Sequence, residues 1–434
     1  MPTRREFLHR ACAVGLGASM PAFAVAGGAR IKSIVRRDET ILRLGGLGDG
    51  FKMTWTADDR QIFAVNDGTG WSQSSSIFYN SRLWAAAGTP QDVSFQEIAG
   101  YPVLNKLIRD DADAPSYYGH GALAARGRID QFLSTLNRTE DTPRHWAGAK
   151  LIYSPDNGRT WCNQDGSSPV VWEEWERQSR ERLAFSGEPR GSFSLLSILQ
   201  MGRDYSGNRD GYIYMYSPNG NVDGQMNELV MLRVPIDRIL DRAAYEYCGG
   251  RLRDGSARWV RDIEARAVVH TFPRGWVNST NLFPGDLVVE SWLPSVVYNE
   301  PLGIYLMASS GIGCAPDGTE FGKPSYLGFW FSRNPWGPWT QIHEDTAWRP
   351  ANDSAACAYA PQIAPKWIAR DGKSFWLVWA DLQGIRAFTR DRASLVADLK
   401  GADSVEERAA VLSAFHRRHL PYYALNTQHV DLAS

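Results

Sequence analysis

The sequence predicts an all-β fold, a five-bladed β-propeller that forms a single domain, and three observations carry this prediction. Short apolar runs rich in β-branched and aromatic residues alternate with Gly, Asn, Asp and Pro, as strands alternate with turns. Hairpin-like pairs of these runs recur with weak internal similarity, which is typical of repeated blades. Helical periodicity is scarce, and one segment matches a turn motif of propellers.

The predicted strands are the brief apolar runs between turn-forming residues. They are Phe51–Trp55, Gln61–Asn66, Lys150–Ser154, Gly211–Ser217, Leu229–Val234, Ser295–Tyr298, Ile304–Ser309, Leu327–Ser332 and Phe375–Ala380. Grouped into hairpins, they give five units at about residues 42–105, 116–175, 190–272, 288–345 and 355–432. We expect the final strand, Tyr422–Val430, to close the ring with the first blade, because closure removes exposed sheet edges. Helical spacing is confined to Ser404–His416 and a shorter run, Ile236–Tyr245.

The segment Ser154–Trp161, SPDNGRTW, fits the pattern S-x-D-x-G-x-T-W, known as the Asp-box of sialidases and other propellers. We expect Ser154 and Asp156 to hold the turn of a hairpin and Trp161 to pack between strands. The motif therefore predicts structure rather than catalysis.

The N-terminus carries the pattern of an export signal. Thr3–Leu8 is a twin-arginine motif, an apolar run too short to span a membrane follows, and small-residue cleavage sites end at Ala24 or Ala26. The sequence predicts a signal peptide over residues 1–26, a propeller over 35–434, and a periplasmic or extracellular location. The alternative is a chance arginine pair before a buried helix.

Composition narrows the class of partner. The net charge is −1 and no basic patch stands out, which argues against nucleic acid and, once the signal is removed, a membrane surface. The 17 Trp residues exceed the needs of one ordinary core, so they either pack within blades or stack on sugars. No feature indicates an oligomeric state.

Four cysteines follow the predicted signal, Cys162, Cys248, Cys314 and Cys357, without the CxxC spacing of a zinc or redox site. One or two disulfides fit an oxidising compartment, and three connectivities are open. No cofactor motif is present, although a metal ion in the central channel is left open, because several Asp side chains converge on the axis of such a fold.

Asp49 and Asp67 are the candidate catalytic pair. Antiparallel pairing of Phe51–Trp55 with Gln61–Asn66 about a turn centred on Asp58 sets Trp55 against Gln61, and the same register sets Asp49 against Asp67. Opposed residues have Cβ atoms roughly 4.5–5.5 Å apart, and like charges at that spacing destabilise a sheet. The pair therefore calls for a functional reason.

Two close carboxylates are what cleavage of a glycosidic bond requires, because one donates a proton while the other, ionised, attacks the sugar or activates water. Carboxyl groups about 5–5.5 Å apart suit retention of configuration and about 6.5–9.5 Å inversion, and the hairpin register favours the shorter spacing. We expect Asp67, which ends a strand directly, to be the nucleophile and Asp49 the acid/base, with the reverse order open. The structural alternative is that both residues only cap turns.

Four segments carry a family resemblance: LGDGFKMTWTADDRQIFAVNDGTGW, LPSVVYNEPLGIYLM, NPWGPWTQ and YAPQIAPKWIARDGKSFWLVWADL. They resemble a bacterial five-bladed propeller family of formerly unknown function that includes the endo-D-arabinanases of actinobacteria. The resemblance covers most of the mature chain and is weakest between about residues 100 and 190. It implies a retaining glycoside hydrolase with two aspartates in G-D-G and N-D-G contexts, which Asp49 and Asp67 match, and an arabinan-type or related polysaccharide as substrate.

Other residues are candidates for substrate binding, each with a structural alternative. His120 and Asp204 are flanked by Gly and are expected to line the same face as the aspartates, and Gln362 is a candidate for a sugar hydroxyl. Aromatic candidates for sugar platforms are Trp71, Trp292 and Tyr359. Glu290 resembles the acid-bearing segment of arabinanase and xylosidase propellers, and otherwise it is a turn or edge charge.

Three functional hypotheses follow from these residues. The first is the retaining hydrolase with two aspartates, the second a non-catalytic carbohydrate-binding propeller, and the third an arabinanase-like or xylosidase-like hydrolase with three carboxylates that uses Glu290. No G-x-S-x-G or H-E-x-x-H motif is present, and no arginine motif near the N-terminus suits a sialidase.

Overall fold

The computed structural model describes residues 31–74, 77–104, 115–138, 145–220, 227–273, 276 and 293–433. The predicted signal peptide and two predicted site residues, Glu290 and Trp292, lie outside these residues. No helix in the described ranges is long and apolar enough to cross a membrane.

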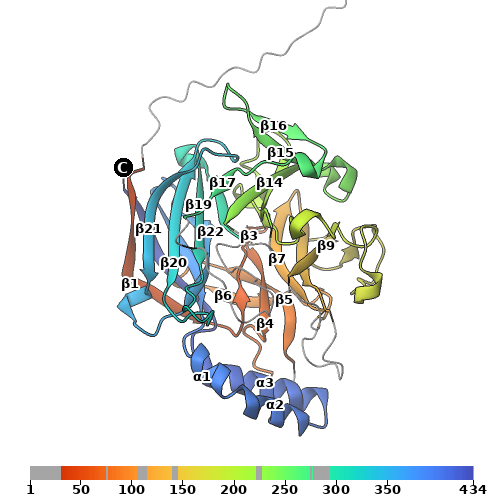
Figure 1. Cartoon of the computed structure of the whole chain (residues 1–434), viewed down its shortest axis with the longest axis vertical. Helices are drawn as coiled ribbons and strands as arrows, with labels where there is room; N and C mark the ends of the chain where they lie inside the picture. Colours follow the sequence, from red (N-terminus) through yellow and green to blue (C-terminus); the bar gives the residue numbers. More distant parts are fainter. Residues whose placement is uncertain are drawn as a thin grey trace, which may run out of the picture.

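Five small antiparallel sheets form a ring, so the predicted five-bladed propeller is confirmed (Figure 1). The first blade holds β2 (Asp49–Gly50), β3 (Thr54–Trp55), β4 (Gln61–Gly68), β5 (Tyr79–Ala87) and β6 (Ser94–Glu97). The second blade holds β7 (Tyr117–Ala125), β8 (Arg128–Leu136), β9 (Trp146–Ser154), β10 (Cys162–Asn163) and β11 (Phe185–Ser186). The third blade holds β12 (Ser197–Ile198), β13 (Tyr212–Pro218), β14 (Glu228–Pro235), β15 (Glu246–Arg251), β16 (Ala257–Val260) and β17 (His270–Thr271). The fourth holds β18 (Ser295–Asn299), β19 (Ile304–Gly311), β20 (Ser325–Ser332) and β21 (Thr340–Trp348), and the fifth β22 (Ala358–Ile368), β23 (Ser374–Asp381), β24 (Leu425–Ala433) and β1 (Ser33–Gly45).

The innermost strands of the blades meet around the axis. β3 contacts β7, β7 contacts β12, β12 contacts β18, β18 contacts β22, and β22 returns to β3. The contacts close a full circle, so residues from different blades converge on the centre.

Ring closure differs in one respect from the prediction. β24 pairs with β23 and with β1, so it lies inside the fifth blade and does not join the first blade's sheet. The N-terminal strand β1 supplies the outermost strand of that blade. The chain's two ends are thus paired in one sheet, which ties the ring shut without a free edge between them.

Aromatic side chains fill the space between blades. Trp276, Trp330, Trp348 and Trp379 are all fully buried. Truncating one of them to Ala would cost about 3–5 kcal/mol, the usual loss for a buried Trp. Packing between blades therefore accounts for several of the Trp residues, as one of the two interpretations of their number expected.

The Asp-box performs the structural role predicted for it. The Asp156 carboxylate accepts bonds from the Thr160 N–H at 2.8 Å and from the Thr160 hydroxyl at 2.8 Å, and the Ser154 hydroxyl accepts the Gly158 N–H at 2.7 Å. Trp161 is buried and packs edge-on against Tyr101 of the first blade.

Three helices, α1 (Ile385–Arg390), α2 (Arg392–Lys400) and α3 (Val405–His419), are inserted between β23 and β24. The helix predicted at Ser404–His416 is α3, and Ser404 caps it by accepting the Glu407 N–H at 3.1 Å. The prediction of a helix at Ile236–Tyr245 is wrong, because this segment forms two short 3-10 turns, η4 (Ile236–Arg238) and η5 (Arg242–Ala244).

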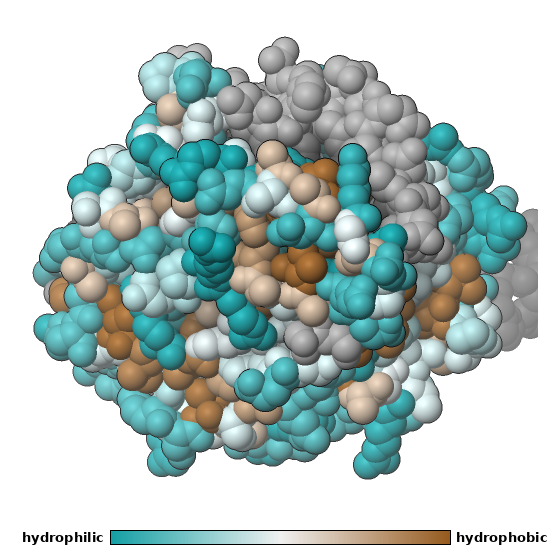
Figure 2. Space-filling model, turned by 90° about the horizontal axis from the view of Figure 1, so that it is seen from below, coloured by the Kyte–Doolittle hydropathy of each residue, from teal (hydrophilic) through white to brown (hydrophobic). Residues whose placement is uncertain are grey.

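The helices gather at one end of the molecule (Figure 1). Seen from that end, apolar residues lie near the centre of the face and in further patches toward its edges, with polar residues between them (Figure 2). Tyr423, between α3 and β24, accepts the Gly48 N–H at 3.0 Å through its backbone carbonyl. The helical insertion is thereby attached to the first blade beside Asp49.

Candidate functional site

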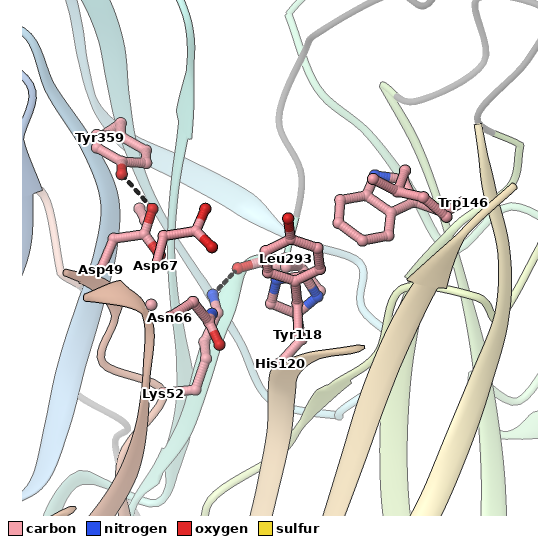
Figure 3. Close-up of a pocket in the computed structure, with 12 residues that line it drawn as sticks. Asp49, Lys52, Asn66, Asp67, Tyr118, His120, Trp146, Leu293 and Tyr359 are labelled. Carbon is pink, nitrogen blue, oxygen red and sulfur yellow. Dashed lines mark hydrogen bonds between the residues drawn. The ribbon is translucent and has the colours of Figure 1, made fainter. Parts of the chain in front are cut away.

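A cavity of about 160 Å³ lies where the inner strands of the first, second and fifth blades meet. Both predicted catalytic aspartates line it, and each is partly exposed. Its walls combine carboxylates, one lysine and several aromatic rings (Figure 3). The described residues that line it are Asp49, Gly50, Lys52, Asn66, Asp67, Tyr118, His120, Leu136, Trp146, Leu293, Tyr359 and Ala360.

The register that brings the two aspartates together differs from the predicted one. Trp55 pairs with Gln61 as expected, but Asp49 pairs with Asn66 and not with Asp67. The chain slips by one residue between β2 and β3, where Phe51 adopts a positive φ of 40°. The direct opposition of Asp49 and Asp67 was therefore a wrong prediction.

The two side chains nevertheless share the cavity because of the backbone at Asp67. In a regular strand Asn66 and Asp67 would point to opposite faces. Asp67 has a φ of 53°, in the left-handed region that Asp tolerates better than most residues, and both residues line the cavity. Figure 3 shows the carboxylates of Asp49 and Asp67 side by side.

Glycine is required where the strand ends approach each other. A Cβ on Gly68 would lie 2.0 Å from the Leu47 carbonyl oxygen, and one on Gly48 would lie 2.5 Å from the Asn66 carbonyl oxygen. Leu47 and Gly70 exchange two backbone hydrogen bonds at 2.9 Å. This close approach fixes the backbone on both sides of the carboxylates.

Tyrosines from the fifth blade surround the pair. The Tyr359 hydroxyl donates to the Asp49 carboxylate, and Tyr359 is buried. Burial and the negative charge of Asp49 raise the pKa of Tyr359 well above its usual value, so it stays a donor. Burial, with Asp49 contributing, likewise raises the pKa of Tyr423, whose hydroxyl donates to the Asn66 carbonyl at 3.4 Å.

Lys52 is the one lysine among the described residues that line the cavity, and it is only 8% exposed. Its ammonium donates to the Leu293 carbonyl, drawn in Figure 3. Burial lowers the pKa of Lys52 to about 7, and the charge of Asp49 opposes this shift. A cation beside two carboxylates offsets part of their mutual repulsion.

His120 lies on β7, where it lines the same cavity as predicted for this residue. Its Nδ1 is 2.9 Å from the Ser134 hydroxyl, and burial, with Lys52 contributing, lowers its pKa to about 3. The imidazole is therefore neutral at ordinary pH and acts as a hydrogen-bonding wall. Tyr118, two residues earlier, stacks on it at 6.1 Å, and Trp146 meets both rings edge-on.

Gln362 lines a smaller cavity of about 20 Å³ deeper along the axis. Lys52 and His120 border both cavities. The Gln362 amide donates to the Pro361 carbonyl at 2.7 Å. It lies below the aspartates rather than beside them.

Besides Gln362, two more of the predicted substrate-binding residues do not line the aspartate cavity. Trp71 stacks on Phe95 at 3.7 Å and donates through its indole N–H to the Leu44 carbonyl, so it belongs to the packing of the first blade. Asp204 accepts the Gly127 N–H at 3.0 Å, past the end of β7 that lies farthest from Tyr118. Asp204 thus lies beyond the end of β7 that is opposite to the cavity.

Tyr359 lines the cavity as expected but through a different contact. Its hydroxyl is engaged by Asp49, while its ring packs edge-on against Phe321 at 5.7 Å. Its position fits an orienting role for the carboxylate better than a flat sugar platform.

Sequence reasoning missed Lys52, Asn66, Tyr118 and Trp146. Lys52 and Asn66 lie close to Asp49 and Asp67 in the sequence of the first hairpin. Tyr118 lies two residues before His120 on β7, so the two side chains share a face of the strand. The sequence positions of these three residues could therefore have indicated that they line the site. Trp146 comes from a strand whose start was not predicted.

No three His, Cys, Asp or Glu side chains within the described ranges converge as a metal site. The four predicted disulfide candidates, Cys162, Cys248, Cys314 and Cys357, are free thiols. The described cavity presents two carboxylates, one lysine and aromatic rings.

No protein-family model matches the chain, and no curated protein sequence matches it. Solved structures with a similar fold include a proposed hydrolase from Bacteroides ovatus, with 13% identity over 90% of this chain and 87% of that one and a TM-score of 0.47. An endo-arabinase from Bacteroides thetaiotaomicron has 13% identity over 81% and 93% of the two chains, with a TM-score of 0.39. The catalytic domain of a GH62 α-L-arabinofuranosidase from Coprinopsis cinerea has 12% identity over 92% of each chain, with a TM-score of 0.40. Identities this low say nothing about the chemistry of the residues in the cavity.

Proposed function

We propose that this protein is a glycoside hydrolase in which Asp49 and Asp67 cleave the glycosidic bond. The observation that carries the proposal is that both carboxylates line one aromatic-walled cavity on the propeller axis (Figure 3). Placing two carboxylates together is unfavourable unless one holds a proton. A protonated and an ionised carboxyl in one pocket form the acid and the nucleophile of glycoside hydrolysis.

The contacts of Asp49 favour the ionised form for that residue. A hydroxyl that donates to a carboxylate stabilises its charge, and so does a nearby ammonium. Tyr359 supplies the first and Lys52 the second. Asp49 is then the nucleophile and Asp67 the proton donor, which reverses the order expected from the strand position of Asp67.

In the first step the Asp67 carboxyl gives its proton to the glycosidic oxygen while an Asp49 oxygen attacks the anomeric carbon. The bond to the leaving sugar breaks and a glycosyl ester forms on Asp49. In the second step the Asp67 carboxylate takes a proton from water, and the oxygen of that water displaces Asp49 from the anomeric carbon. Two inversions retain the configuration.

The proposed substrate is an arabinan-type or related polysaccharide, in keeping with the resemblance to the endo-D-arabinanase family. Tyr118 and Trp146 offer ring surfaces in the cavity, and Asn66 and His120 offer polar groups. Sites of this kind, mostly aromatic with a few fixed polar groups, suit small polar ligands with apolar faces. We further propose export by the twin-arginine route, which would place the enzyme where polysaccharides occur.

The test is a screen of the mature protein against plant and bacterial polysaccharides, followed by Asp49→Asn and Asp67→Asn on any substrate found. Both folded variants should lose hydrolysis by several orders of magnitude. NMR of the first product should show the anomer of the substrate. Wild-type turnover in both variants would eliminate this pair, and the next residue to replace would be Glu290.

The alternative is a non-catalytic carbohydrate-binding propeller, which the aromatic lining would also serve. Binding without turnover, unaffected by either Asp→Asn change, would favour it.

A further inference from the structure

A third cavity lies beside the adjoining ends of two strands in the second blade. It has a volume of about 370 Å³ and is formed by the ends of β8 and β9 and by the segments around residues 175–178 and 186–187. Its lining includes Asn137, Arg138, His145, Trp175, Glu176 and Gln178. We call this cavity the outer groove.

The outer groove and the aspartate cavity share a wall. Leu136 and Trp146 line the aspartate cavity, while their chain neighbours, Asn137 and His145, line the groove. The indole N–H of Trp175 donates to the Leu136 carbonyl at 3.2 Å, which ties the groove to that wall.

The outer groove lies farther from the inner strand β7 than the aspartate cavity does, because its residues Ser186 and Gly187 follow β11's pairing with β9. The aspartate cavity reaches outward from Tyr118 on β7 through Leu136 on β8 to Trp146 on β9, and Figure 3 shows Trp146 at its far side from Asp49. Neighbouring strands are about 4.8 Å apart, so β9 lies about 10 Å outward from β7. The groove continues beyond it, past Gly187, whose N–H donates to the Ala147 carbonyl at 3.2 Å. A chain molecule that extends from the aspartates past Trp146 would reach the groove on the other side of this wall.

The lining of the groove is fixed and both aromatic and polar. Trp175 is partly exposed, and the Arg138 guanidinium lies 5.5 Å from its ring and pairs with Glu176. The Gln178 amide donates to the Tyr117 hydroxyl at 3.1 Å and to the Thr135 hydroxyl at 3.3 Å. Held in place by these contacts, the side chains lose little freedom when a ligand binds.

We propose that the outer groove is a distal subsite that binds further sugar units of the same polysaccharide whose bond is cut at Asp49 and Asp67, with Trp175 as its stacking platform. The proposal rests on the proposed function for the reaction itself. It adds that the enzyme selects long chains, because a substrate of one or two units fills only the aspartate cavity.

The test compares Trp175→Ala with Trp172→Ala. Trp172 is a matched control, because it lies in the same loop, donates its indole N–H to the Val103 carbonyl at 3.1 Å and packs on Tyr117, but does not line the groove. The probes are a long linear arabino-oligosaccharide and an aryl arabinofuranoside, each in D and L forms. Trp175→Ala should lower kcat/KM for the long probe about tenfold, the size of a lost stacking contact, and leave the short probe unchanged. Trp172→Ala should leave the ratio of kcat/KM for the long probe to kcat/KM for the short probe at the wild-type value.

Calorimetric binding of the same probes to an Asp67→Asn protein, with and without Trp175→Ala, separates the groove from the reaction. If the wild type cleaves neither probe, tighter binding of the long probe that Trp175→Ala abolishes still supports the groove. Equal binding of long and short probes, or a length dependence that survives Trp175→Ala, overturns the proposal.

Discussion

Replacing Lys52 with Met should make the protein more stable at neutral and acidic pH while making it a poorer enzyme. Met has a similar length, fills the same buried space and carries no charge. The ammonium of Lys52 is buried, and its one carbonyl partner, Leu293, replaces only part of the water it loses. The groups that face it are Asp49 and Asp67 from the first blade and the neutral His120 from the second.

The size of the effect follows from the pKa of Lys52, which falls from 10.5 to about 7 on folding. Between these values the unfolded chain binds more protons than the folded one, so stability rises with pH. Below about pH 7 the full free-energy cost of burying the charged Lys52 ammonium is present, and above about pH 10.5 this cost vanishes. Between about pH 6 and about pH 10, the titration of Lys52 should raise the free energy of unfolding of the wild type by on the order of 4 kcal/mol.

The assay is urea unfolding of the wild type and Lys52→Met at about pH 6 and about pH 10. The stability advantage of the variant should shrink by about 4 kcal/mol between the two, because only the wild type titrates there. An advantage that stays constant with pH would show that the charge of Lys52 is not the destabilising element, and the argument would fail. On an established substrate kcat should drop, because Asp49 loses its neighbouring cation.

Three further predictions concern the same chain. Tyr359→Phe removes the hydroxyl that donates to Asp49, and a hydrogen bond to a charged group is worth about 1.5–3 kcal/mol. The acidic limb of the pH profile of kcat/KM should therefore move to higher pH by roughly one unit. An acidic limb at the wild-type pH would contradict the role given to Tyr359. Asp49→Asn and Asp67→Asn should each leave the melting temperature at or slightly above the wild-type value by relieving repulsion, measured by calorimetry, and a large loss would instead make the pair structural. Replacing Arg4 and Arg5 with Lys should leave precursor in the cytoplasm on cell fractionation, and normal export would exclude the twin-arginine route.

The blades could be predicted because their determinants are local. Seven of the nine predicted strands lie within a strand of the structure, since apolar runs bounded by turn residues specify a strand without reference to the rest of the chain. Gly211–Ser217 begins one residue before β13, and of Phe51–Trp55 only Thr54–Trp55 is a strand. The outermost strand of the fifth blade could not be placed in this way. β1 finds its partner almost four hundred residues away in β24, from Ser33 opposite Ala433 to Gly45 opposite Leu425, and no local pattern encodes which terminal strand pairs with which sheet.

The site shows the same limit at the scale of single residues. The composition of the hairpin pointed to Asp49 and Asp67, but strand alternation from Trp55 would pair them directly, and the chain instead slips at Phe51. The left-handed backbone at Asp67 then turns its side chain back into the cavity. Both departures are backbone conformations that an L-residue adopts at some cost, and such conformations persist where the surrounding structure holds them, as the close approach of Leu47 does here. After the slip at Phe51, a regular strand through Asp67 would have sent the two carboxylates to opposite faces, so the left-handed backbone at Asp67 is what brings both into the cavity.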